Sequence, residues 1–577
     1  MRWKQFYASS YEEILQKDFP QKTLWKFLES GILEDNNQHD ALVYFGRRIS
    51  RKEFVEQVYL WARVIKGMGL DEGDEVLLFG PSFPEFIYIM LAADMIGVTA
   101  NLPNLMVKPE VLETMVGNSR VAFVFDGLEK PIRKTLQNPQ FEHVVILSAT
   151  PLLGLLKFGL RFKAKYLTAD AAIRRFGKYE GPLETEPVKG KAAYIFCSSG
   201  TSGQGYAKQI GMSDEAMIAM CRNALAFNLK GDPCPQEGRS YCQLPPFVCT
   251  GFFVLVMAPL YRGMTVYLDP RMSARRFATN ILTIRPQITL ATGANWVYLT
   301  HQLDRLIQKG KRPDLSCFTF PVMGGEGCTP EALRHINEVM EACGSRVALT
   351  SGYGLTETFS VSTVDYEPTG FDKDYTRPAV CVGYPFPGTL VGIFDENGNE
   401  LGYEERGEIW VKTQALTLGY VNAPQLNQER FRDGWLRTQD FGQMDRSGKV
   451  FVYGRMDQYV MTNSGEKVYL FDIANRLRED IAVKDALVCQ LAAPGSPLVA
   501  HLVLENNHSE TQKEILCRLD GILQDFLPAG LRIEGYHLEP EQLKINIVGK
   551  IDRNYYSHLL TGYFDKEQNA IAFTQAK

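Results

Sequence analysis

The sequence predicts an α/β protein with a large N-terminal domain over residues 1–454 and a small α+β domain over residues 455–577. Helical and strand-like apolar patterns alternate through the first part of the chain, and short alternating strands with tight turns follow after about residue 388. A compact pattern of strands and helices then occupies residues 467–560. At 577 residues the chain is too long for one core, since single cores stop growing at about 250–300 residues.

The alternation begins with a helix over residues 51–68. Apolar residues recur there at helical spacing, and Gly69 is typical of the residue after a helix end. A strand is expected over residues 76–79 and a second, buried helix over residues 84–96. Further short apolar runs predict strands at 144–147, 192–196, 266–268, 287–290 and 347–349. This order is typical of parallel-rich sheets.

The character of the chain changes after residue 388. Short strands are expected at 391–394 and 408–411, with a tight turn at Asn397-Gly398, so this part predicts a small antiparallel β-barrel within the large domain. We place the domain boundary near Gly454-Arg455, because the pattern beyond it is sufficient for a small core of its own.

Composition excludes several classes of protein. Hydrophobic residues make up 45% and charged residues 22% of the sequence, as in an ordinary globular protein. The net charge of −5 gives no general field for nucleic acid, and the 11 cysteines are scattered without a CxxC pair, which argues against a disulfide framework and a zinc site. A secretory signal and a run of about 18 apolar residues are both missing, so we expect a cytoplasmic protein that does not span a membrane.

The segment from Leu152 to Leu167 leaves an alternative open. It is an apolar stretch interleaved with basic residues, a pattern that also occurs at membrane surfaces. A surface loop and helix whose lysines face water is the preferred interpretation. Membrane-surface contact is kept as the minor hypothesis.

A loop of small residues follows the expected strand at 192–196. Its backbone N–H groups and hydroxyls are suited to surround a phosphate. The G-x-x-x-x-G-K-[ST] pattern of the usual P-loop is missing, so a flexible turn explains the loop equally well from the residues alone. The loop consists of Ser198, Ser199, Gly200, Thr201, Ser202 and Gly203.

Five further motifs follow this loop: Gly352-Tyr-Gly-Leu-Thr-Glu-Thr358, Gly434-Trp435 with Asp440, Gly454-Arg-Met-Asp457, Ser464-Gly-Glu-Lys467, and Gly549-Lys-Ile-Asp-Arg553. In this order the motifs resemble the adenylate-forming superfamily, which includes acyl- and aryl-CoA synthetases, luciferases and peptide-synthetase adenylation domains. The resemblance extends from about Ala41 to Arg553. It implies that ATP and Mg²⁺ activate a carboxylic acid as an acyl-adenylate, and that the small domain is mobile.

The resemblance implies that the loop of small residues contacts the β- and γ-phosphates of ATP, with Lys208 as its lysine. The superfamily usually has G-x-P-K at this point, whereas this chain has two extra residues and no proline. Gly325 and Glu326, in a glycine-rich turn after a probable strand, would lie near the adenine. Taken alone, that turn indicates only a tight loop.

The motif at 352–358 matches the Y-G-x-T-E signature without departure. Tyr353 and Gly354 would bind ATP, since the tyrosine offers a flat face for adenine. Thr356 is suited to donate to the α-phosphate, and Glu357 is the metal ligand, because Mg²⁺ usually binds through one or two carboxylates plus substrate phosphates. A capped helix start is the structural alternative.

Asp440 and Arg455 match two ribose contacts of the superfamily. Asp440 would accept hydrogen bonds from both ribose hydroxyls, although Gln439 replaces the customary glycine. Asp457 falls at the hinge of the superfamily, where an ordinary surface turn is the alternative.

The last two motifs are expected to serve the thiol and the catalytic lysine. Ser464 and Gly465 would line the thiol tunnel, one residue later than usual. Lys550 would be the catalytic lysine: a carboxylate attacking an α-phosphate brings two anions together, and an ammonium between them relieves the repulsion.

The expected acid pocket contains Phe247, Val248 and Cys249. Val248 stands where the superfamily often has histidine, so an apolar acyl chain is favoured over a small or charged acid. The aromatic residues of this segment are also explained as ordinary core residues.

We therefore predict an enzyme that couples an apolar, fatty-acid-like acid to the thiol of coenzyme A, with no nucleic-acid partner. Loading of a separate acyl-carrier protein is one alternative. A binding protein that senses acyl-adenylate or nucleotide without turnover is the other.

Overall fold

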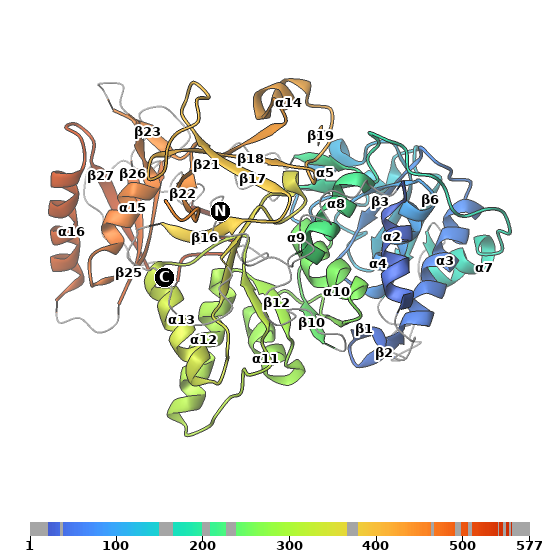
Figure 1. Cartoon of the computed structure of the whole chain (residues 1–577), viewed down its shortest axis with the longest axis horizontal. Coiled ribbons are helices and arrows are strands. Elements are labelled where there is room, and N and C mark those ends of the chain that lie inside the picture. Colours follow the sequence, from blue (N-terminus) through green and yellow to red (C-terminus); the bar gives the residue numbers. More distant parts are fainter. Residues whose placement is uncertain are drawn as a thin grey trace.

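The computed structural model describes residues 21–34, 39–148, 166–198, 208–226, 238–365, 379–462, 467–490, 498–505, 510–540, 542–545, 550–552 and 555–556. The expected membrane-contact segment therefore lies outside the described residues except at its last two positions. Over these ranges the chain forms two large sheets and two small ones (Figure 1). None of the described helices is both long and apolar enough to cross a bilayer.

The first large sheet has eight strands in the order β19-β9-β8-β4-β3-β5-β6-β7. Neighbours from β8 to β7 are parallel, while β9 and β19 add an antiparallel edge. Because β8 and β9 form a hairpin, the loop between them starts at the carboxyl end of a parallel strand. The strands are β3 (Glu75–Phe79), β4 (Thr99–Asn101), β5 (Ser119–Phe125), β6 (His143–Leu147), β7 (Leu167–Thr168), β8 (Tyr194–Cys197), β9 (Gln209–Met212) and β19 (Gly419–Tyr420).

The second large sheet has fourteen strands and changes character along its length. Its path is β17-β18-β21-β22-β16-β15-β14-β13-β12-β10-β11-β1-β2, with β20 paired to β21. The parallel part is β1 (Asp40–Tyr44), β10 (Arg239–Cys242), β11 (Thr265–Leu268), β12 (Ile288–Ala291), β13 (Phe320–Met323) and β14 (Thr350–Tyr353), and β2 (Arg47–Ser50) and β15 (Thr363–Asp365) pair antiparallel at its two ends. The antiparallel part is β16 (Val380–Pro385), β17 (Thr389–Phe394), β18 (Arg406–Thr413), β20 (Phe431–Arg432), β21 (Trp435–Met444) and β22 (Val450–Arg455).

The strands expected at 391–394 and 408–411 are β17 and β18 of this antiparallel part. β16 and β17, the two ends of the set, follow each other in the chain. The set encloses its own apolar cluster, formed by Val382, Ile393, Ile409, Val411 and Val450.

Helices cover the sheets and connect their parallel strands. α3 begins where the Ser50 hydroxyl accepts the backbone N–H of Glu53, and the chain leaves it through Gly69 at a φ of 83°. The helices of this part are α2 (Leu24–Glu34), α3 (Arg51–Gly67), α4 (Pro84–Met95), α5 (Pro109–Met115), α7 (Ala169–Phe176), α8 (Asp214–Ala226), α9 (Cys249–Phe252), α10 (Ala258–Tyr261), α11 (Ala274–Ile284), α12 (Gly293–Gln308), α13 (Pro330–Ala342) and α14 (Pro424–Arg430), with the short helical turns η2 (Thr135–Gln137), η3 (Phe253–Met257) and η4 (Thr356–Thr358).

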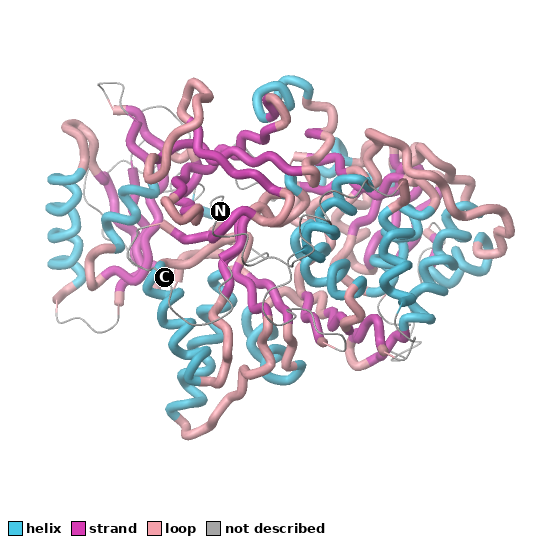
Figure 2. Tube along the Cα trace, in the orientation of Figure 1, coloured by secondary structure: helices cyan, strands magenta, loops and turns pink. Residues whose placement is uncertain are grey.

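The chain beyond β22 forms a separate apolar cluster between Val460 and Tyr536. Its elements are β23 (Tyr459–Met461), β24 (Lys467–Tyr469), α15 (Leu470–Arg478), β25 (Val483–Gln490), β26 (Leu498–Leu504), α16 (Gln512–Phe526) and β27 (Ile533–Glu539). In Figure 1 this part lies at the opposite end from α2, α3 and α4. Figure 2 shows the strand-rich region of β16–β18, β21 and β22 between the two.

The structure confirms most of the expected elements, with one error. The helices at 51–68 and 84–96 are α3 and α4, and the strands at 76–79, 144–147, 192–196, 266–268 and 287–290 are β3, β6, β8, β11 and β12. The strand expected at 347–349 is wrong, because β14 begins at Thr350, where it pairs with Val322. The backbone N–H of Leu349 donates instead to the Asn337 side chain at 2.8 Å, so Ala348 and Leu349 are buried without being strand residues.

Glu85, in the first turn of α4, gives a stability prediction. Its Oε2 is buried and has no hydrogen-bond partner among the described residues, and burial raises the pKa of its carboxyl to about 7. Between pH 4.5, the ordinary value, and pH 7 the folded state therefore holds a proton that the unfolded state releases, so stability falls as the pH rises through this window.

We expect Glu85→Gln to unfold like the wild type at the acidic end of this window and to be more stable above it. Each pKa unit corresponds to about 1.4 kcal/mol, and with a discount for the part of the side chain that water reaches the gain is about 2 kcal/mol. Urea unfolding at a series of pH values measures this. A constant difference between the two proteins across the window would contradict the prediction.

Candidate active site

A cavity of about 640 Å³ lies at the carboxyl ends of β13 and β14, where open parallel sheets commonly bind ligands. Its wall also includes residues of α15 and β25 and the segment 550–551, so the large and small parts of the chain both contribute. The predicted residues that line it are Ser198, Lys208, Phe247, Val248, Cys249, Gly325, Glu326, Tyr353, Gly354, Thr356, Glu357, Asp440, Arg455 and Lys550.

The remaining predicted residues are the rest of the small-residue loop, the pair expected at the thiol and the expected hinge. Ser199–Gly203 and Ser464–Gly465 lie outside the described residues. Asp457, the expected hinge, has an exposed side chain whose Oδ1 lies 4.0 Å from Nε of Arg455.

The two ends of the small-residue loop are joined to each other. The backbone N–H of Ser198 donates to the Lys208 carbonyl at 2.9 Å, and the backbone N–H of Lys208 donates to the Ser198 hydroxyl at 3.0 Å. This closure holds Lys208 at the cavity despite the two extra residues. Its Nζ lies 5.3 Å from the centre of the Tyr420 ring, and burial lowers the pKa of the ammonium.

Asp440 lies between two donors at the meeting of three strands. Tyr353 Oη on β14 donates to its Oδ2 at 2.6 Å, and Arg455 on β22 donates to its Oδ1 at 2.9 Å. Asp440 and Arg455 are register partners of β21 and β22, so the sheet itself sets this pair. Burial raises the pKa of the Asp440 carboxyl, and the adjacent guanidinium opposes the rise.

Glu357 lies in η4, directly after the sharp turn that ends β14. A Cβ at Gly354 would lie 1.5 Å from the Ser360 carbonyl oxygen, so only glycine fits there. Glu357 is buried, and its Oε1 accepts a hydrogen bond from Tyr420 Oη at 2.7 Å. The capped helix start, which was the structural alternative for this motif, is present as the short turn of η4. This turn places Thr356 and Glu357 in the cavity wall.

Lys550 reaches the cavity from a short hairpin of the small part. Ile545 and Ile551 form a β-bridge, and the backbone N–H of Asp552 donates to the Lys544 carbonyl at 2.8 Å. The backbone N–H of Ile551 donates to the Glu326 carboxylate, which joins the hairpin to the large part. Burial lowers the pKa of the Lys550 ammonium, and the carboxylates of Glu326 and Asp440 oppose this.

Two strands and a helical segment line one part of the cavity, mostly with apolar side chains, and we call this part the channel. Alternate residues of β12 and β13 form one wall: Ile288, Leu290, Phe320 and Val322. The helical side of the lining includes a stripe at every fourth position of the segment α9–η3–α10, formed by Thr250, Val254, Ala258 and Arg262. The stripe residues are half-buried while most residues between them are buried, so this segment turns one face to the channel.

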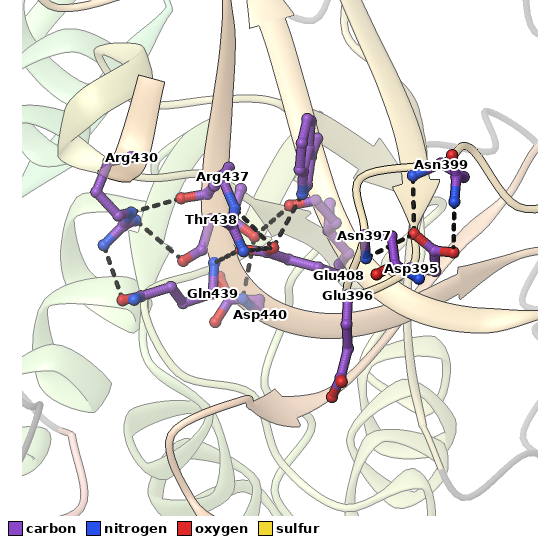
Figure 3. A network of polar contacts seen from close by, with 12 residues as sticks. Asp395, Glu396, Asn397, Asn399, Glu408, Arg430, Arg437, Thr438, Gln439 and Asp440 are labelled. Carbon is purple, nitrogen blue, oxygen red and sulfur yellow. Dashed lines mark hydrogen bonds and ion pairs between the residues drawn. The ribbon is translucent and has the colours of Figure 1, made fainter. Parts of the chain in front are cut away.

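Arg430 lines the cavity and Tyr420 contacts two residues of its wall, and no motif in the sequence indicated either of them. Tyr420 contacts Glu357 through its hydroxyl and Lys208 through its ring. Arg430 ends α14 and is held by the strand that carries Asp440 (Figure 3). The one signal of Arg430 in the sequence was Gln439, which replaces the customary glycine beside Asp440. The Gln439 side chain accepts a hydrogen bond from Arg430.

Comparison with known proteins finds related sequences and similar folds. The model of the family described as AMP-binding enzyme matches residues 32–421. A long-chain-fatty-acid–CoA ligase of Yersinia pestis is 24% identical over 518 residues, covering 83% of this chain and 85% of that relative. The anthranilate CoA ligase AuaEII in complex with anthranoyl-AMP has a similar structure, with a TM-score of 0.75 at 18% identity over 95% of this chain and 99% of that one. McyG A-PCP complexed with phenylalanyl-adenylate has a TM-score of 0.71 at 18% identity over 95% of this chain and 85% of that one.

Proposed function

Because this chain belongs to the AMP-binding enzyme family, we propose that it activates an apolar carboxylic acid with ATP and transfers the acyl group to coenzyme A. The observation that carries the proposal is the position of Lys550, which enters a cavity that the large part of the chain lines with Tyr353, Glu357 and Asp440. Two regions far apart in the sequence thus supply one site.

In the first step the acid's carboxylate oxygen attacks the α-phosphorus of ATP, and the bond to pyrophosphate breaks. Lys550 neutralises charge between the two anions, and Thr356 donates to the α-phosphate. Asp440 and Arg455 bind the ribose. Glu357 fits one magnesium ion, because Tyr420 uses only its Oε1 and Mg²⁺ needs few protein carboxylates beside substrate phosphates. A bound ion would shield the phosphate charges.

In the second step the thiol attacks the acyl carbonyl and AMP leaves. We propose that residues 455–577 rotate relative to residues 1–454 about Asp457, which withdraws Lys550 and brings Ser464 and Gly465 to the thiol. The contact between Ile551 and Glu326 would break in this rotation.

The channel favours a long, unbranched acid. Thr250, at the reacting end, adjoins Cys249, whose thiol contacts the Thr356 hydroxyl. From Thr250 to Arg262 the helical wall is about 18 Å long at 1.5 Å per residue. An extended chain advances at most about 3.6 Å for every three bonds, so this length holds about 15 bonds.

Pyrophosphate release with Mg-ATP tests the proposal. We expect release with long-chain acids, and faster turnover when coenzyme A is added. If pyrophosphate is released but coenzyme A accepts no acyl group, a carrier protein becomes the acceptor, the alternative that the A-PCP neighbour favours. Absence of release with fatty, aryl and amino acids would contradict the ligase and favour the non-catalytic binding protein.

Two channel variants test the acid class separately. Ala258→Trp would block the channel about two turns from Thr250, and Val254→Trp about one turn, so the longest accepted acid should shorten to about ten and about five bonds. We expect activity with acids below each limit to persist. Equal loss for all chain lengths would show that the channel does not hold the acid.

A further inference from the structure

Arg430 is a buried arginine without an acidic partner. Arg430 is 2% exposed and lines the cavity. No carboxylate among the described residues lies within ion-pair distance of its guanidinium. Arg437, seven residues on, shows the contrast, because its guanidinium lies 3.0 Å from Glu408. A buried charge is costly unless an opposite charge balances it.

The guanidinium of Arg430 is fixed by three neutral acceptors. Its Nε donates to the Arg437 carbonyl at 2.6 Å, one terminal nitrogen to Gln439 Oε1 at 2.9 Å, and the other to the Thr438 carbonyl at 3.2 Å (Figure 3). A guanidinium has five N–H donors in a rigid fork. Two donors therefore remain for a ligand in the cavity.

The backbone of Gln439 has an unfavourable conformation in this arrangement. Its φ is 60°, in the left-handed region that favours glycine, which is the residue the superfamily has at this position. The glutamine side chain supplies what glycine lacks, an acceptor for Arg430. The strained residue and the buried arginine thus form one unit, which we call the Arg430–Gln439 pair.

Two cations lie together beside this part of the cavity, and the carboxylates nearest to them, Glu357 and Asp440, already accept hydrogen bonds from neighbouring side chains. Arg430 and Lys208 lie 5.9 Å and 5.3 Å from the centre of the same Tyr420 ring. Burial lowers the pKa of the Lys208 ammonium, and Arg430 lowers it further, which places the two cations close together. Asp440 and Arg455, the proposed ribose contacts, bind each other instead.

We propose that the Arg430–Gln439 pair binds the β,γ-phosphate end of ATP, and the pyrophosphate that leaves. This inference rests on the proposed function for the identity of the anion. The position supports it, because β19, which carries Tyr420, pairs with β9 directly after the small-residue loop. Arg430 thus gives this chain a phosphate contact from α14 in addition to the loop.

The test compares binding of inorganic pyrophosphate with binding of AMP by calorimetry on the full chain. We expect Arg430→Gln to weaken pyrophosphate binding about 10- to 100-fold, as for the loss of charged hydrogen bonds, and to leave AMP binding unchanged. Adenylation should show a raised KM for ATP, while thioester formation from supplied acyl-adenylate, which has no β,γ-phosphates, stays as in the wild type.

Two variants control for structural damage. Arg437→Gln removes a neighbouring arginine of the same network that does not line the cavity, and it should bind pyrophosphate normally. Gln439→Gly removes the anchor and the left-handed strain together, so its two effects on stability oppose each other, and it should bind pyrophosphate several-fold more weakly.

The outcomes separate this inference from the proposed function. If no acid is adenylated but Arg430→Gln still weakens pyrophosphate binding alone, the ligase proposal fails and the phosphate contact stands. Equal weakening of pyrophosphate and AMP in Arg430→Gln, or an equal effect of Arg437→Gln, would overturn the assignment of Arg430 to the phosphates.

Discussion

Lys550→Ala will lower the rate of adenylation by about 10²–10³-fold, the usual loss when one preorganised donor to a developing charge is removed. The ammonium enters the cavity beside Gly325, where a Cβ would lie 3.6 Å from its Cε. Its loss leaves the attacking carboxylate and the α-phosphate without a shared cation. Pyrophosphate release under saturating ATP measures the effect.

The same variant should form thioester from supplied acyl-adenylate at the wild-type rate, because the proposed rotation removes Lys550 from the site before the thiol reacts. Lys544→Ala is the matched control, since this lysine belongs to the same hairpin but is exposed and outside the cavity wall. Equal loss of both half-reactions in Lys550→Ala would mean that the lysine acts on folding or nucleotide binding instead.

Adenylation should also depend on the protonation of Lys550. Because burial lowers the pKa of this ammonium, kcat/KM should begin to fall with rising pH at a value below the ordinary 10.5. Lys550→Arg keeps its charge at every accessible pH, so the fall of kcat/KM on the alkaline side of the pH profile, the alkaline limb, should move to higher pH. An unchanged limb in that variant would assign the titration to another group.

Much of this site could be predicted from the sequence because several of its residues belong to short motifs carried on strands. Tyr353, Asp440 and Arg455 belong to short motifs on β14, β21 and β22. The pairing of β21 with β22 brings Asp440 and Arg455 together, and Tyr353 reaches Asp440 through its hydroxyl group. Local patterns also predicted α3, α4 and the parallel strands.

The rest depends on contacts that have no local signature. Leu349 reads as a strand residue, but its N–H is bound by Asn337, twelve residues away. Arg430 lies in a polar stretch typical of a surface helix, and only folding of β21 against α14 shows that it is buried. Gln439 departs from the glycine that the superfamily usually has, but its role depends on the position of Arg430, which local sequence does not give.

Asp440→Asn should weaken both half-reactions, in contrast to the Lys550 and Arg430 variants. The carboxylate sits between Tyr353 and Arg455, and each oxygen has lone pairs left to accept a ribose hydroxyl. Asparagine keeps the shape but replaces one acceptor by an N–H₂ donor, so we expect one charged hydrogen bond, about 10- to 100-fold in affinity, to be lost for every ligand that contains the ribose.

Binding of AMP, ATP and acyl-adenylate by the same variant should therefore fall by the same factor, whereas inorganic pyrophosphate, which has no ribose, should bind normally. Asp433→Asn is the control, because that side chain is 88% exposed just before β21. Asp440→Asn should still fold, since the side-chain carbonyl of the asparagine can accept the hydrogen bond from Arg455. If Asp440→Asn weakened ATP but left AMP binding intact, the carboxylate would contact phosphate or metal rather than ribose, and the orientation of the nucleotide proposed for this cavity would be reversed.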